Sequence, residues 1–131
     1  MTYRDLITSA MASVCEDSAT PFGFEDYTSR APYLLASFVT QYAKLDSDYR
    51  KANNMTGKEI FTDMVAVNPE DTFPLCDVFV PAAIYHLASG LVMDENEEMS
   101  DKFFDRYIKI ILEIRDSMPA TTSAIIDRYG L

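Results

Sequence analysis

Apolar residues recur at steps of three and four in four segments of the chain, at about residues 3–15, 25–51, 77–93 and 96–117. This spacing is typical of helices that bury one face against a core. The four stripes consist of Leu6, Ile7, Ala10, Met11 and Val14; Leu34, Leu35, Phe38, Tyr42, Leu45 and Tyr49; Val80, Ile84, Leu87 and Leu91; and Phe103, Tyr107, Ile110, Ile114 and Met118. The pattern predicts an all-α protein, with residues 1–131 forming a single domain like a four-helix bundle.

The second helix contains Pro32 near its start, and the pattern allows two interpretations. Either the helix begins at Ser29 with Pro32 in its first turn, or a longer helix is kinked at Pro32. The connector that follows, at residues 55–75, has no helical period, and EIFTDMVAV within it could form a short strand or two. Its length indicates either an ordered arm or a functional loop.

The fourth helix is apolar over an unusually wide part of its circumference. Phe104, Ile108 and Leu112 widen its stripe beyond one buried face. Such a helix is either central in the fold or shares a contact with another chain. The tail at residues 119–131 also carries apolar residues, which implies that it docks onto something. The candidate contacts with partners or other copies are therefore Phe104, Ile108, Leu112, Ile125, Ile126 and Tyr129.

An acidic cluster, DENEE at residues 94–98, lies between the third and fourth helices. A calcium loop of the EF-hand type that started at Asp94 would need Gly where Met99 stands and Glu where Asp105 stands. A capped turn explains the cluster better: Asp94 would cap the fourth helix, with Glu97 as its capping-box partner. Thr2 and Asp5 form a similar capping pair at the start of the first helix. We therefore predict that the third and fourth helices form an antiparallel hairpin.

Twenty-one acidic residues against eleven basic ones give a formal charge of −10. This charge argues against broad binding to phosphate backbones or anionic membranes, so we expect no specific recognition of nucleic acid and no membrane partner. The N-terminus lacks the uninterrupted apolar core of a signal peptide, and the apolar run at 78–93 is about two residues too short for a membrane span. We expect an intracellular protein.

No residue pattern predicts catalysis, a cofactor or a metal centre. His86 is the one histidine, and no pattern near it resembles a nucleophile elbow or a Cys–His pair. We expect a satisfied or solvent-reaching helix histidine. Cys15 and Cys76 are too few for a zinc site, and two buried thiols are favoured over a disulfide. The sequence therefore offers no candidate catalytic site, which leaves an enzyme with an unrecognised site as one alternative.

Two longer stretches resemble the head-to-tail adaptor, or connector, proteins of tailed phages. RDLITSAMASVCED, EDYTSRAPYLLASFVTQY and DYR are similar to the first two helices of that family. DTFPLCDVFVPAAIYHLASGLVMDENEEMSDKFFDRYIKIILEI is similar to its second helix pair, in which a Phe-Pro-Leu lead-in precedes an Ala-rich helix, an acidic turn and a long helix with spaced aromatic residues. Together these stretches cover about two-thirds of the chain.

The resemblance implies a structural protein and not an enzyme: a phage or prophage protein that forms a ring under the portal and receives the tail. The implied partners are the portal, the tail or head-completion proteins, and other copies of the chain. The implied location is the bacterial cytoplasm during assembly and then the virion. The connector and the tail would reach neighbouring proteins, and negative walls would let DNA pass through the ring without being held.

The alternative is a small acidic helical regulatory protein that binds one protein partner, for example as a DNA mimic. It predicts a stable monomer or dimer with acidic residues on one face.

Overall fold

The fold was analysed in a computed structural model, which describes residues 1–17, 24–58, 60 and 64–118. The chain folds into α1 (Tyr3–Asp17), α2 (Phe24–Ala52), a short 3₁₀ turn η1 (Asp77–Phe79), α3 (Val80–Val92) and α4 (Glu97–Ser117). The all-α prediction is confirmed, and the helix ends lie within two residues of the predicted ranges except at the start of α3, where residues 77–79 form the 3₁₀ turn. α2 begins at Phe24 and contains Pro32, so the longer of the two predicted helices is the one that forms.

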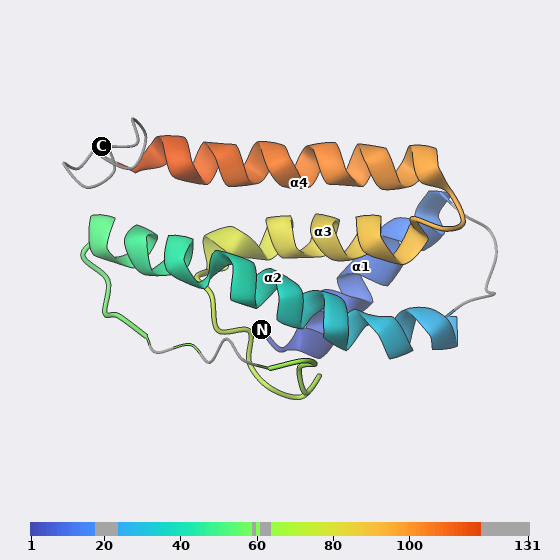
Figure 1. Ribbon diagram of the computed structural model, residues 1–131, viewed down its shortest axis with the longest axis horizontal. Coiled ribbons are helices and arrows are strands. Elements are labelled where there is room, and N and C mark those ends of the chain that lie inside the picture. The colour runs from blue at the N-terminus through green and yellow to red at the C-terminus, as the bar shows by residue number, and fades with distance from the viewer. Residues whose placement is uncertain (18–23, 59, 61–63, 119–131) are drawn as a thin grey trace.

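The central helix of the fold is α3, because α1, α2 and α4 all pack against it. Figure 1 shows α3 between α4 on one side and α2 on the other, with α1 crossing behind. Small buried residues, Ala82, Ala83 and Ala88, let the neighbours approach closely. At Gly90 an added Cβ would lie 3.0 Å from a methyl group of Leu34 on α2, so a larger residue there would require the Leu34 side chain to move.

α4 lies at the edge of the fold and makes its main helix–helix contact with α3. The interpretation that the wide apolar surface of α4 makes it the central helix is therefore wrong. α3 takes that place because its small residues suit close packing on several sides, whereas the longer charged side chains of α4 need solvent. The predicted antiparallel hairpin of these two helices is confirmed (Figure 1).

A short turn joins α3 to α4, and its cap differs from the prediction. The amides of Glu95 and Asn96 both donate to the carbonyl of Val92, at 3.1 and 2.8 Å. The Asn96 side chain then accepts from the Met99 amide at 3.0 Å, so Asn96 caps α4. The prediction that Asp94 is the cap and Glu97 its partner is wrong. Because α3 ends at Val92, Asp94 lies in the turn that follows it, and Glu97 becomes the first residue of α4.

Two buried serines hold the hairpin together beyond the turn. The Ser89 hydroxyl donates to the Ser100 carbonyl, and the Ser100 hydroxyl donates to the Ser89 carbonyl, each at 2.9 Å. Both residues are buried, so their polar atoms are satisfied by one another. This reciprocal pair fixes the register of α3 against α4.

Arg30 of α2 ties the far end of α3 to the rest of the fold. Its guanidinium donates to the carbonyls of Gly90 and Leu91, at 3.2 and 2.8 Å, and pairs with Asp26 at 2.9 Å. The last carbonyls of a helix have no partner within the helix and carry partial negative charge. Arg30 therefore acts as a C-terminal cap for α3 that comes from another helix.

The connector between α2 and α3 is an ordered arm over its described residues. These residues contain no strand, and one isolated antiparallel bridge joins Thr72 to Thr2. Around that bridge the amide of Tyr3 donates to Asp71, the amide of Arg4 to Pro69, and the amide of Phe73 to Met1, at 2.9–3.0 Å. Val67, Phe73 and Leu75 are buried in the core. The arm therefore fastens the start of α1 to the lead-in of α3.

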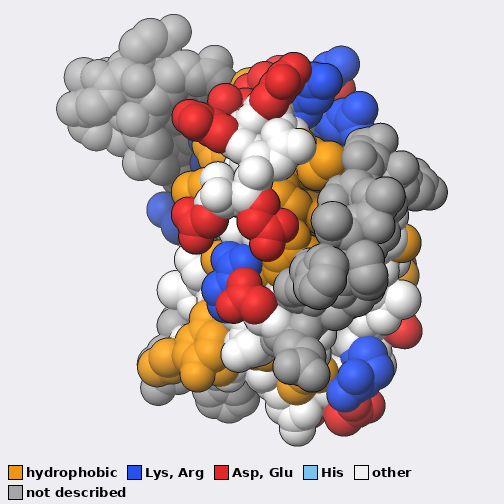
Figure 2. All heavy atoms as spheres, turned by 90° about the vertical axis from the view of Figure 1, so that its right-hand side faces the viewer, with side chains coloured by type: hydrophobic (Ala, Val, Ile, Leu, Met, Phe, Trp, Pro, Cys, Tyr) orange, Lys and Arg blue, Asp and Glu red, His pale blue; other side chains and the backbone are white. Residues whose placement is uncertain are grey.

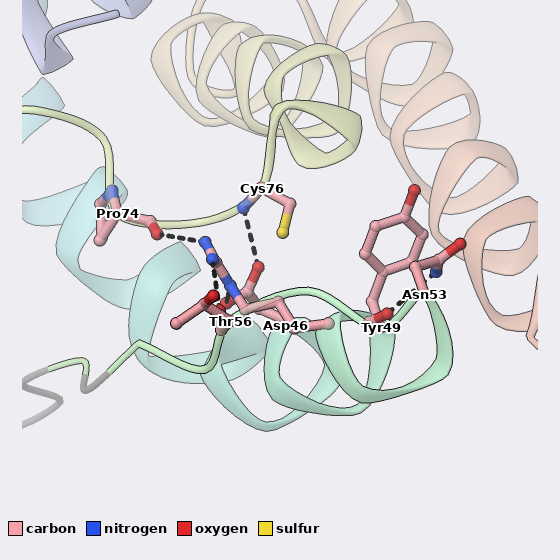
Figure 3. A network of polar contacts seen from close by, with 7 residues as sticks. Asp46, Tyr49, Asn53, Thr56, Pro74 and Cys76 are labelled. Carbon is pink, nitrogen blue, oxygen red and sulfur yellow. Dashed lines mark hydrogen bonds and ion pairs between the residues drawn. The ribbon is translucent and has the colours of Figure 1, made fainter.

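A buried carboxylate fixes the other end of this arm. Asp46 on α2 is fully buried and accepts from the Cys76 amide at 2.8 Å and from the Arg50 guanidinium at 2.9 Å (Figure 3). Arg50 also donates to the carbonyls of Thr56 and Pro74, at 3.3 and 3.2 Å. One ion pair thus joins the last turns of α2 to both ends of the arm and places the start of α3.

Candidate interaction surface

A row of apolar side chains is exposed along one flank of α4. We call Phe104, Ile108 and Leu112 the α4 ridge. Phe104 and Leu112 expose 49% and 51% of their surface, and Ile108 is half-buried between them and the core. Residues four apart lie one above the other on a helix, so the three side chains form one continuous strip.

The α4 ridge rests on a rigid aromatic base. The ring of Phe104 meets that of Tyr107 edge to face, with centroids 5.5 Å apart. Tyr107 is buried, and its hydroxyl is hydrogen-bonded to the hydroxyl of Tyr42 on α2. Burial, together with this hydrogen bond, raises the pKa of Tyr107 well above its ordinary value, so the Tyr107 hydroxyl stays protonated at neutral pH. The edge-to-face contact between Phe104 and the buried Tyr107 holds one end of the ridge in place.

Opposite charges lie beyond the two ends of the ridge. Asp101 precedes Ile108 by seven residues and Arg115 follows it by seven, so all three lie on nearly the same face of α4. Both charged side chains are exposed, and neither forms an ion pair with another described residue. The surface is therefore an apolar strip with an acidic end and a basic end.

The end of the molecule where α3 passes into α4 is strongly acidic. Exposed carboxylates gather there, as the upper half of Figure 2 shows. They belong to Asp94, Glu95, Glu97, Glu98 and Asp101. Glu97 and Glu98 lie in the first turn of α4, where the helix dipole favours negative charge. Met99 and Asp105 are both helical, so the cluster does not extend into a calcium-binding loop.

His86 is the titratable group whose setting departs most from expectation. Its ring packs between Phe38 and Tyr107, with centroids 5.3 and 5.0 Å away. Its Nδ1 atom is buried and has no hydrogen-bond partner among the described residues, so the expectation of a satisfied or solvent-reaching histidine is wrong for this atom. Burial lowers the pKa of His86 to about 4 because the charged ring would lose its hydration. The imidazole is therefore neutral at pH 7 and serves as a packing group.

Cys76 is a buried free thiol. Burial, followed by the hydrogen bond and charge of Asp46, raises its pKa to about 11, so the thiolate is scarce at neutral pH. Its environment is that of a structural residue, as expected for one of two buried thiols. The side chain of Cys15 lies outside the described residues.

Metal ligands and membrane spans were sought in the part of the chain that the structure describes. No group of three or more His, Cys, Asp or Glu side chains there could hold a metal ion. No helix there is long and apolar enough to cross a membrane.

The sequence found part of the candidate surface and missed the rest. Phe104, Ile108 and Leu112 do lie together, whereas Ile125, Ile126 and Tyr129 fall outside the described residues. Asp101 and Arg115 were missed because each looks like an ordinary solvated residue until Ile108 is known to be partly exposed. Their signal in the sequence is the heptad spacing 101, 108 and 115.

Comparison of the chain with protein-family models, with curated proteins and with solved structures finds no match. The adaptor role suggested by the sequence therefore remains a prediction.

Proposed function

We propose that this protein is a structural head-to-tail adaptor of a tailed phage or prophage, which assembles into a ring on the portal and receives the tail. The observation that carries the proposal is the α4 ridge: apolar side chains on a helix at the edge of the fold, half exposed in one chain. Burying such a strip against a neighbour is favourable by about 25 cal/mol for each Å² of apolar surface. In a ring, neighbouring copies would cover it.

The order of the elements and the charge support the same proposal. An ordered arm precedes an antiparallel hairpin with an acidic turn, which is the order that the family resemblance rests on. A formal charge of −10 suits a ring through which DNA slides, because the walls would not hold phosphate groups. The role requires no catalytic group, and the neutral His86 and Cys76 suit a structural protein.

The test is reconstitution with the portal protein encoded in the same genome. Purified chain is mixed with portal rings, and the complex is examined by electron microscopy and by sedimentation. We expect an added ring of density on the portal, and we expect Leu112→Asp to prevent its formation. Tyr33→Asp is the matched control, since Tyr33 is 57% exposed but lies on α2. A genome without portal genes, or portals that stay bare, would refute the proposal.

The acidic end of the hairpin favours a second candidate, an acidic regulatory protein that binds one protein partner in place of DNA. Its carboxylates gather on one end of the molecule (Figure 2). This candidate predicts a one-to-one complex with a nucleic-acid-binding protein that duplex DNA displaces, and no ring. Substituting Glu97 and Glu98 by Gln would weaken that complex, while leaving assembly through the α4 ridge intact.

A further inference from the structure

The two ends of the α4 ridge carry opposite charges, and this arrangement is self-complementary. Asp101 and Arg115 stand at equal distances from Ile108 along the helix. Phe104 and Leu112 also stand at equal distances from it. A copy of α4 turned end for end about Ile108 would therefore place each of these residues opposite its counterpart.

We propose that the free protein forms an antiparallel two-fold dimer in which the α4 ridges of two copies pack against one another around Ile108. Phe104 of each copy meets Leu112 of the other, and Asp101 of each copy meets Arg115 of the other. The contact is isologous, so the same patch serves on both sides and the pair closes upon itself.

Charge decides the orientation of the two helices. In a parallel pair, Asp101 would face Asp101 and Arg115 would face Arg115, which is unfavourable at both ends. In the antiparallel pair, two ion pairs form at the rim of an apolar strip, the place where such pairs select partner and orientation. Neither residue has to leave an ion pair with another described residue to do so.

The position of α4 makes this approach possible. α4 lies at the edge of the fold with α3 on its inner side, so an antiparallel neighbour can lie alongside it (Figure 1). Helices cross at about 20° when rows of residues three apart on one helix pack into the grooves between rows of residues four apart on the other, and at this shallow angle the ends of the two ridges stay close together. Phe104 is already held by Tyr107, so little side-chain freedom is lost on contact.

The size of the contact sets its strength. Three apolar side chains from each copy, two of them already about half-buried, make an interface smaller than the roughly 1,200–2,000 Å² of stable complexes. Each copy also carries a formal charge of −10, and these charges repel. We therefore expect a weak dimer that dissociates on dilution, with a Kd in the range of tens to hundreds of micromolar.

The test is sedimentation equilibrium of the full chain over about 10 µM to 1 mM. Leu112→Asp should abolish the dimer. Val65→Asp should leave it unchanged, because Val65 is 77% exposed but lies on the connector and not on α4. Asp101→Arg and Arg115→Asp should each weaken it about three- to tenfold, because both ion pairs become like-charge contacts. The double variant Asp101→Arg/Arg115→Asp should restore the affinity of the original chain, because both pairs form again with the charges exchanged.

A chain that stays monomeric up to 1 mM overturns the inference. A double variant that is as weak as the single ones overturns the antiparallel pairing, and an equal loss with Val65→Asp would place self-association elsewhere. Far-UV circular dichroism checks that each variant is folded. Because no portal is present, the result is independent of the adaptor role: a dimer can form in a protein that never meets a portal, and a ring can form from monomers.

Discussion

The buried carboxylate of Asp46 allows a quantitative test of what holds the fold together. Asp46→Ala removes an acceptor from the Cys76 amide and from the Arg50 guanidinium. Removing one partner of a buried ion pair typically costs about 3–5 kcal/mol. Arg50 keeps its bonds to the carbonyls of Thr56 and Pro74, and its side chain is 14% exposed, so we expect a value near the lower limit, about 3 kcal/mol.

Urea unfolding followed by far-UV circular dichroism measures this loss directly. A domain of this size is stable by roughly 5–15 kcal/mol, so the variant should fold but should melt about 10 °C lower or more. Asp48→Ala is the matched control, because Asp48 lies on the same helix and is exposed. It should change stability by less than about 0.5 kcal/mol.

A double variant separates the ion pair from simple loss of packing. Asp46→Ala/Arg50→Ala leaves no uncompensated buried charge, so it should cost less than the sum of the two single substitutions. The reasoning is refuted if Asp46→Ala costs below about 1 kcal/mol or if the single losses simply add.

Three further predictions concern single residues. His86 has a pKa of about 4 in the folded chain against about 6.5 in the unfolded chain, so the unfolded state binds more protons between these pH values. The free energy of unfolding should therefore fall by up to about 3 kcal/mol as the pH drops from 6.5 to 4. Urea unfolding of His86→Leu should lack this pH-dependent loss. Asn54 has a φ of 55° after the end of α2, so thermal unfolding should show a loss of about 1 kcal/mol for Asn54→Ala and none for Asn54→Gly. Asn96→Ala should cost about 1 kcal/mol by the same assay, whereas Asp94→Ala should cost little, and the reverse order would contradict the assigned cap.

Local patterns in the sequence predicted the helices well, because burial repeats along a helix with a fixed period. The cap at Thr2 shows the same: its hydroxyl accepts from the Asp5 amide at 3.3 Å and its amide donates to Asp5 at 2.9 Å, as the spacing predicted. The capping residue of α4 could not be predicted from local spacing alone. Asp94 and Asn96 are both good caps by type, and the choice depends on where α3 ends.

Local patterns in the sequence could not predict contacts between segments that are far apart along the chain. Arg30 caps a helix that ends sixty residues later, and Asp46 anchors a backbone amide thirty residues away. The sequence does contain one indication of the ion pair, because Asp46 stands four residues before Arg50, beside the apolar stripe of α2. The sequence also left open whether the fourth helix is central or contacts another chain, because a wide apolar surface does not show whether the surface that covers it belongs to the same chain.

The position of α4 at the edge of the fold has a consequence for how the chain opens. α1, α2 and α3 are joined by the connector arm, by Asp46 and by Arg30, whereas α4 depends mainly on its hairpin with α3. Amide protons of α4 should therefore exchange with solvent through a partial opening that costs less than global unfolding, while those of α3 exchange only when the whole domain unfolds. The helix with the exposed surface would then be a unit of cooperativity of its own, which opens while the rest of the domain stays folded.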